Sequence, residues 1–142
     1  MSATFTAATQ ADDMAYILEH CRTVAVVGLS PKPHRDSYAV SRYMQAQGWR
    51  IVPINPNADQ ILGETAYPSL TEAARQQRIE LVNVFRNSAD VPPVVDEAIA
   101  IGAQAVWLQM GVVHGVAALK ARAAGLRVVQ DRCLMVEHRR RL

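Results

Sequence analysis

The chain has 142 residues, of which half are hydrophobic and a fifth are charged, as is usual for one soluble globular domain. Its formal net charge of +2 is too small to favour a nucleic-acid-binding surface. No apolar run approaches the roughly 20 residues that cross a bilayer, and the N-terminus lacks the pattern of a signal peptide. We therefore expect a single cytoplasmic domain over residues 1–142, with residues 1–10 flexible and neither membrane nor nucleic acid as a partner.

The first predicted element is a helix, because Met14, Ile17 and Leu18 recur at helical spacing after two candidate caps, Asp12 and Asp13. Five short apolar runs follow, each too short for a helix. Continuous runs of this kind favour strands that are covered on both faces in a parallel sheet. The runs are VAVVGL, RIVPI, ELVNVF, AVWLQ and RVVQ, which start at Val24, Arg50, Glu80, Ala105 and Arg127.

Helical patterns lie between these runs. Ser69 followed by Glu72 predicts a capped helix, and Pro92 and Pro93 predict the first turn of the next one. Strands that alternate with helices predict βαβ units with right-handed crossovers. We expect an α/β, Rossmann-like single domain of about five parallel strands in the order 3-2-1-4-5, with helices on both faces and an extra N-terminal helix. Glycines predict the ends of three helices: Gly48, Gly102 and Gly125.

The turn after the first predicted strand, which begins at Gly28, is the leading candidate for a binding site. Ligands of open α/β sheets bind beyond the carboxyl ends of the strands, and the following helix presents free N–H groups and partial positive charge there. A glycine lets the backbone approach a ligand closely. The turn also carries two hydroxyls and three basic side chains: Ser30, Ser37, Lys32, His34 and Arg35.

This turn matches neither standard nucleotide loop. It has no G-x-x-x-x-G-K-[ST] sequence, and of G-x-G-x-x-G only the first glycine is present. The second predicted strand ends in neutral Asn55, where NAD-binding proteins carry an acidic residue for the ribose diol. A neutral side chain does not repel a phosphorylated ribose. A pyrophosphate ligand that also accommodates a ribose phosphate fits this pattern, and both coenzyme A and NADP meet that description.

Three stretches resemble a known family. VAVVGLSPKPHRDSYAVSRYMQAQGWRIVPINP, VFRNSADVPPVVDEAIAIGAQAVWLQMGVV and AGLRVVQDRCLMVEHRR are similar to the small stand-alone CoA-binding proteins. These in turn resemble the N-terminal CoA-binding domain of the succinyl-CoA synthetase alpha subunit. The resemblance runs from about Thr23 to Arg140 and implies a Rossmann-like fold that binds coenzyme A or acyl-CoA.

The resemblance also implies a set of cofactor-binding residues. The turn after the first strand would hold the pyrophosphate, and the end of the second strand would lie beside the adenosine. The end of the third strand would line the crevice, and the LQMG stretch would approach the pantetheine arm. In chain order the residues are Gly28, Leu29, Ser30, Lys32, Arg35, Ser37, Asn55, Pro56, Phe85, Arg86, Gln109 and Gly111.

No catalytic or metal-binding residue is predicted, because the histidines are scattered and the two cysteines, Cys21 and Cys133, have no metal or redox spacing. We expect non-catalytic binding of coenzyme A or acyl-CoA. The alternatives are an NADP-dependent oxidoreductase and an interaction subunit of a split acyl-CoA ligase, with another protein or a second copy as partner. Trp107 is expected in the core. The sequence leaves open whether Cys133 is inert or forms a mixed disulfide with bound coenzyme A.

Overall fold

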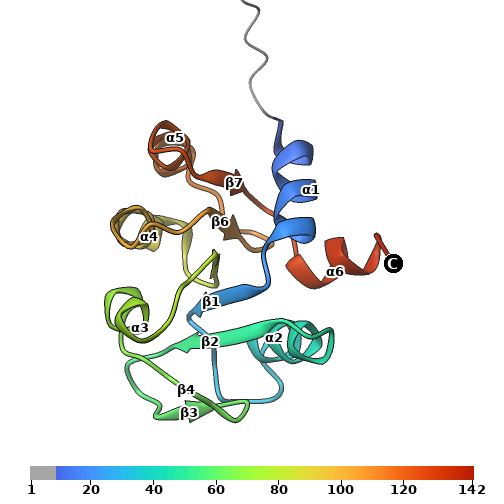
Figure 1. Ribbon diagram of the computed structural model, residues 1–142, viewed down its shortest axis with the longest axis vertical. Helices are drawn as coiled ribbons and strands as arrows, with labels where there is room; N and C mark the ends of the chain where they lie inside the picture. The colour runs from blue at the N-terminus through green and yellow to red at the C-terminus, as the bar shows by residue number, and fades with distance from the viewer. Residues whose placement is uncertain (1–8) are drawn as a thin grey trace, which may run out of the picture.

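The apolar runs form a parallel five-stranded sheet in the computed structural model, which describes residues 9–142 (Figure 1). Each strand coincides with a predicted run, and nearly all strand residues are buried because helices cover both faces. The predicted α/β class with a parallel sheet is confirmed. The strands are β1 (Thr23–Val27), β2 (Arg50–Ile54), β5 (Leu81–Val84), β6 (Ala105–Leu108) and β7 (Arg127–Val129).

The order of the strands differs from the prediction. The sheet runs β2-β1-β5-β6-β7, so the third long strand lies beside the first, and the predicted order 3-2-1-4-5 is wrong. A small hairpin, β3 (Gln60–Ile61) and β4 (Glu64–Thr65), leads the chain back along the outer edge of β2. There the Tyr67 N–H donates to the Pro53 carbonyl and the Tyr67 carbonyl accepts from the Asn55 N–H, both at 2.9 Å.

Because this segment occupies the outer edge of β2, β5 pairs with the free side of β1. The strand order therefore reverses between β1 and β5. In open α/β sheets the binding crevice lies at this reversal, beyond the carboxyl ends of the two strands.

Within residues 9–142, six α-helices cover the sheet, three on each face (Figure 1). Trp107 is fully buried between the sheet and the helices α1, α2 and α6, as predicted. The short helix α6 was not predicted, and it turns the C-terminal residues back toward α2. One layer holds α1 (Gln10–His20), α2 (Asp36–Ala46) and α6 (Leu134–Arg139); the other holds α3 (Leu70–Gln76), α4 (Val91–Ala100) and α5 (Gly115–Ala123).

Helix α1 begins one turn earlier than its predicted caps. The Thr9 hydroxyl accepts the Asp12 N–H at 3.1 Å, and the Asp12 carboxylate accepts the Thr9 N–H at 3.0 Å, which lowers the pKa of Asp12. The prediction of Asp12 or Asp13 as cap is therefore wrong. Thr9 and Gln10 belong to this helix, and the rest of the N-terminus that was expected to be flexible lies outside the described residues. The predicted Ser69 cap is confirmed.

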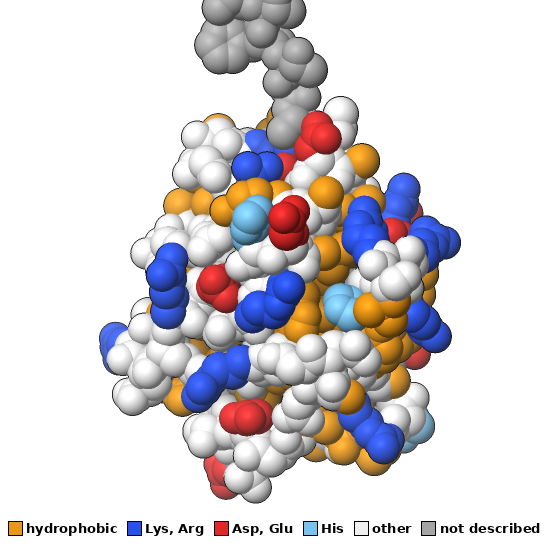
Figure 2. Space-filling model, turned by 45° about the vertical axis from the view of Figure 1, so that its right-hand side comes forward, with side chains coloured by type: hydrophobic (Ala, Val, Ile, Leu, Met, Phe, Trp, Pro, Cys, Tyr) orange, Lys and Arg blue, Asp and Glu red, His pale blue; other side chains and the backbone are white. Residues whose placement is uncertain are grey.

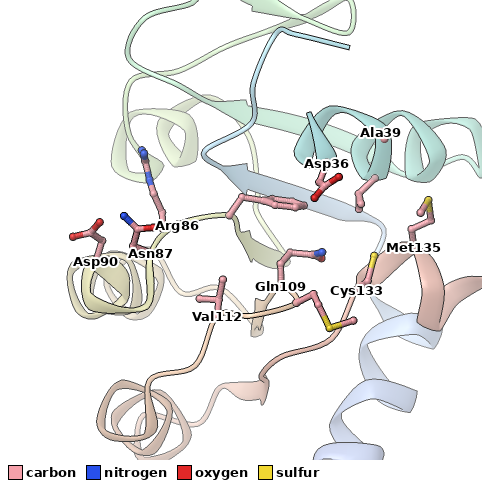
Figure 3. Close-up of a pocket in the computed structure, with 12 residues that line it drawn as sticks. Asp36, Ala39, Arg86, Asn87, Asp90, Gln109, Val112, Cys133 and Met135 are labelled. Carbon is pink, nitrogen blue, oxygen red and sulfur yellow. The ribbon is translucent and has the colours of Figure 1, made fainter. Parts of the chain in front are cut away.

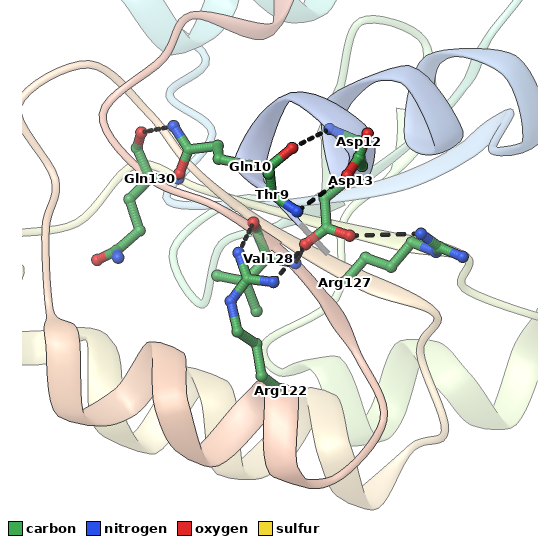
Figure 4. A network of polar contacts seen from close by, with 8 residues as sticks. All are labelled: Thr9, Gln10, Asp12, Asp13, Arg122, Arg127, Val128 and Gln130. Atoms are coloured by element: carbon green, nitrogen blue, oxygen red, sulfur yellow. Dashed lines mark hydrogen bonds and ion pairs between the residues drawn. The ribbon is translucent and has the colours of Figure 1, made fainter. Parts of the chain in front are cut away.

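Asp13 is buried between α1 and β7 and holds three groups there (Figure 4). Its carboxylate pairs with Arg122 at 2.6 Å and Arg127 at 3.4 Å, and it accepts the Val128 N–H at 3.1 Å. A carboxylate that is 1% exposed is stable only with such partners. Asp13 therefore fixes the first helix against the last strand.

Gln10 makes a second contact along the same edge (Figure 4). Its side-chain Nε2 donates to the Gln130 carbonyl and its Oε1 accepts the Gln130 N–H, both at 2.9 Å. The outward-facing peptide groups just beyond β7 are therefore bonded to a side chain of α1.

A hydrogen bond joins α2 to α6 through His138, whose partial burial makes the fold sensitive to pH. Tyr43 Oη lies 2.9 Å from His138 Nδ1, and burial, with Arg22 contributing, lowers the pKa of His138 below its ordinary value of 6.5. The unfolded chain therefore takes up a proton on this histidine more readily than the folded chain does. We expect the free energy of unfolding to fall as the pH drops below about 6.5.

Urea unfolding between about pH 7.5 and pH 5 tests this expectation. His138→Gln should flatten the loss of stability over that range, whereas His34→Gln, which alters an exposed loop residue, should leave the profile unchanged. Parallel profiles for the wild type and His138→Gln would contradict the assignment.

Figure 2 shows Lys and Arg side chains spread among acidic and uncharged groups, with several of them near one another at the right-hand side of the view. Among residues 9–142, no helix is long and apolar enough to cross a membrane.

Candidate functional site

Two adjoining cavities lie beyond the carboxyl ends of β1 and β5. The first, of about 440 Å³, lies against the turn after β1 and is here called the loop cavity. The second, of about 530 Å³, lies between α2, the ends of β5 and β6, and the start of α6 and is called the main cavity. Asp36 and Phe85 line both, so the two cavities adjoin at these residues, and together they are called the crevice. The other residues of the loop cavity are Gly28, Ser30, Lys32, Arg35 and Ser37.

Gly28 permits a close contact inside the protein. Its φ is +86°, and a Cβ at this position would lie 2.3 Å from the Phe85 carbonyl oxygen. Its N–H donates to the Ile54 carbonyl at 3.2 Å. The glycine therefore lets the turn after β1 pack against the end of β5, and because it also lines the loop cavity, its role in the approach of a ligand stays a prediction.

The free backbone donors of the turn after β1 are not those of Ser30 and Lys32. The Ser30 N–H donates to Ser37 Oγ at 3.0 Å, and Ser30 Oγ accepts the Lys32 N–H at 3.1 Å, so these groups fold the loop. Among the hydrogen bonds of residues 9–142, the N–H groups of Leu29, Asp36 and Ser37 have no acceptor. Two of these three open α2, where the helix dipole adds positive potential.

Charge is distributed unevenly along the crevice. Lys32 and Arg35 are exposed at the loop cavity, and Arg86 lies at the far end of the main cavity. The carboxylate of Asp36 lies between them, where the cavities meet. A phosphate is therefore favoured on the loop side of Asp36 and disfavoured beside it. His34, which belongs to the same basic loop, does not line either cavity.

The main cavity is lined by apolar and polar side chains together (Figure 3). Asp36 and Ala39 face it from α2, and Cys133 and Met135 lie at the end opposite Arg86. Its remaining lining residues are Val40, Phe85, Asn87, Asp90, Gln109, Met110 and Val112.

Gln109 supplies a polar group to the wall of the main cavity. The residue is 4% exposed, and its Oε1 accepts the Leu134 N–H at 3.0 Å. Its Nε2 points into the space below α2 (Figure 3) and has no acceptor within the described part of the chain. This amide is therefore free to donate a hydrogen bond to a bound group.

Four of the predicted site residues do not line either cavity. The Leu29 side chain is fully buried in the core. Asn55 Nδ2 donates to the Leu29 carbonyl at 3.0 Å, which ties β2 to the turn, and Pro56 is exposed beyond it. The Gly111 N–H donates to Asp131 Oδ1 at 2.7 Å.

The other eight predicted residues come together: Gly28, Ser30, Lys32, Arg35, Ser37, Phe85, Arg86 and Gln109. Sequence reasoning missed Asp36 and Met135. In the sequence Asp36 comes after the basic residues of the turn and before the apolar residues of α2, a position that could have been noticed. The position of Met135 depends on α6, a six-residue helix without a side-chain cap.

The crevice offers several kinds of polar group. Hydroxyls, amides, backbone N–H groups and guanidinium or ammonium ions can donate hydrogen bonds, and the side chains of Asp36 and Asp90 also line it. Within residues 9–142, no group of three or more His, Cys, Asp and Glu side chains could hold a metal ion.

Comparison with known proteins agrees with this geometry. The family model described as CoA binding domain matches residues 22–139. The chain belongs to this family. The resemblance to CoA-binding proteins is therefore confirmed, and it covers the sheet, the crevice and α6.

Two relatives of this chain are of similar size. The uncharacterized protein YneT of Bacillus subtilis is 40% identical over 122 residues, which are 86% of this chain and 89% of that protein. A solved structure of a hypothetical protein from Pyrococcus horikoshii OT3 is 36% identical, with a TM-score of 0.86, over 99% of this chain and 98% of that one.

A more distant likeness extends to a larger enzyme. The dinucleotide forming acetyl-coenzyme A synthetase 1 of Ca. Korarchaeum cryptofilum is 22% identical, with a TM-score of 0.68. The match covers 80% of this chain but 26% of the synthetase, and it shows the fold alone.

Proposed function

We propose that the protein binds coenzyme A or acyl-CoA across both cavities of the crevice and performs no reaction on it. The observation that carries this proposal is the junction at Asp36 and Phe85 of two cavities in a chain of the CoA-binding family. The loop cavity is bordered by cations and free N–H groups, and the main cavity combines apolar side chains with polar ones such as Gln109. Coenzyme A has charged phosphates at one end and, at the other, an arm that combines apolar segments with amide groups.

The charged end of the ligand matches the loop cavity. Three phosphates carry roughly four negative charges at neutral pH, counting about one to two for each. Lys32 and Arg35 lie where they can pair with these charges, and the N–H groups of Asp36 and Ser37 can bond a diphosphate oxygen. The carboxylate of Asp36 opposes movement of the phosphates into the main cavity.

The neutral end of the ligand matches the main cavity. Phe85, Met110 and Met135 offer apolar contacts to the pantetheine arm, and Gln109 Nε2 can donate to one of its amide carbonyls. Cys133 and Met135 would then lie near the thiol or acyl end. The groups of the crevice bind and orient a ligand, and we assign none of them a catalytic role.

Calorimetric titration tests the proposal against its alternative. Coenzyme A and NADP both carry a diphosphate and a ribose phosphate, but only coenzyme A has a flexible arm for the main cavity. We expect coenzyme A to bind more tightly. Tighter binding of NADP, or binding of neither, would overturn the proposal.

Removal of two cations should weaken binding without harm to the fold. Lys32→Ala combined with Arg35→Ala should raise the dissociation constant of coenzyme A by roughly tenfold for each residue, about 1.4 kcal/mol each. Both side chains are exposed, and neither makes a side-chain hydrogen bond within residues 9–142. The effect should shrink at high salt, because exposed charges are screened.

Arg42→Ala is the matched control for this measurement, since Arg42 is exposed on α2 and does not line either cavity. Its dissociation constant should equal that of the wild type. Equal weakening in the control and in the double variant would mean that net charge, and not the loop, determines affinity.

A further inference from the structure

The two cysteines lie in contrasting environments at opposite ends of the sheet. Cys21 precedes β1 and is fully buried, and burial raises the pKa of its thiol to about 11. Cys133 follows β7 at the carboxyl end of the sheet and is only partly buried. Since parallel strands place these positions at opposite edges, an internal disulfide between the two is excluded.

The Cys133 side chain forms part of the wall of the main cavity. In Figure 3 its sulfur lies beside Met135, across from Asp36 and Ala39 on α2. A ligand in this cavity would therefore contact the thiol, whereas a ligand confined to the loop cavity would not.

A second observation indicates that this end of the cavity receives a ligand. Gln109 is more than nine-tenths buried, and its Nε2 has no acceptor among residues 9–142 and points into the cavity. This amide nitrogen opens onto the cavity, so an acceptor on a bound group can take its hydrogen bond. The amide and the thiol share one cavity, so an acceptor-bearing arm bonded to Gln109 would extend toward Cys133.

We infer that Cys133 is a site of reversible modification by coenzyme A through thiol–disulfide exchange. This inference rests on the proposed function, because the crevice must first bind the cofactor. The Cys133 thiolate attacks one sulfur of oxidised coenzyme A, the disulfide of two coenzyme A molecules. A protein–coenzyme A disulfide forms, the bond between the two cofactor sulfurs breaks, and the second coenzyme A leaves as a thiolate that takes up a proton. The disulfide is the oxidant, and no other reagent is needed.

Intact-mass spectrometry of reduced protein incubated with oxidised coenzyme A tests the inference. We expect one coenzyme A adduct per chain, mapped by peptide analysis to Cys133, absent from Cys21 and removed by a thiol reductant. The rate should saturate with oxidised coenzyme A and should fall when a coenzyme A analogue without a thiol competes. Oxidised glutathione, which lacks the nucleotide, should react roughly tenfold more slowly or less and without saturation.

Two results would overturn the inference: no adduct at Cys133, or an adduct that forms equally fast with oxidised glutathione and ignores the competitor. Cys133→Ser separates this inference from the proposed function. If reduced coenzyme A still binds Cys133→Ser and the wild type in calorimetry while no adduct forms on the wild type, only the modification is wrong. If neither protein binds coenzyme A, the proposed function fails as well.

Discussion

Gly28→Ala should lower the free energy of unfolding by about 3 kcal/mol, the sum of two penalties. The residue has a φ of +86°, which an alanine adopts at a cost of about 1–2 kcal/mol. The new methyl group would also lie 2.3 Å from the Phe85 carbonyl oxygen, so the backbone at the end of β5 must shift. Urea or guanidinium denaturation measures the loss.

Gly48→Ala separates the two penalties. Gly48 has a similar φ of +91° at the end of α2, but a Cβ there would meet nothing within 4 Å. Its substitution should cost about 1 kcal/mol, from the backbone conformation alone. Equal losses in the two variants would show that the contact with Phe85 is unimportant. Because Phe85 lines both cavities, Gly28→Ala should also weaken ligand binding, whereas Gly48→Ala should not.

Asp13→Asn should be the second strongly destabilising change, by about 3 kcal/mol. The substitution keeps the size of the side chain but removes the charge that Arg122 and Arg127 face. It also replaces the carboxylate that accepts the Val128 N–H by an amide group. The buried Val128 N–H and the two partly exposed arginines would then face a neutral group that pairs with them poorly. Equilibrium unfolding in urea measures the change.

Asp96→Asn is the control for Asp13→Asn. Asp96 pairs with Lys120 at 2.6 Å, a distance as short as that between Asp13 and Arg122, but more than half of each side chain is exposed. Surface pairs of this kind contribute roughly 0–1 kcal/mol. A loss for Asp96→Asn as large as that for Asp13→Asn would contradict the view that burial determines the difference.

The sequence predicted the strands well because the burial of a strand determines the types of residue that it contains. A strand that is covered on both faces reads as an unbroken apolar run, and each of the five runs became a strand. The strand order left no comparable trace. It depends on Tyr67, whose backbone bonds to the edge of β2, and backbone hydrogen bonds place no demand on the type of side chain.

The site was predicted only in part for a related reason. Residues such as Lys32 and Phe85 carry chemistry in their side chains, and they do line the crevice. Asn55 was expected beside a ribose because of its position after the second strand, yet its amide bonds to the Leu29 carbonyl. Whether a polar side chain faces a ligand or stabilises a turn depends on contacts that are distant in sequence.

Both borders of the sheet are closed to further strands. At the edge of β2 the backbone of Tyr67 bonds to the Pro53 carbonyl and the Asn55 N–H. At β7 the side chains of Asp13 and Gln10 bond to the peptide groups of Val128 and Gln130. Open strand edges are templates for edge-to-edge aggregation, which such blocking prevents. Variants that remove hydrogen bonds at the edge of β7, such as Asp13→Asn, would thus leave an unpaired strand edge that favours aggregation, and they would also destabilise the fold.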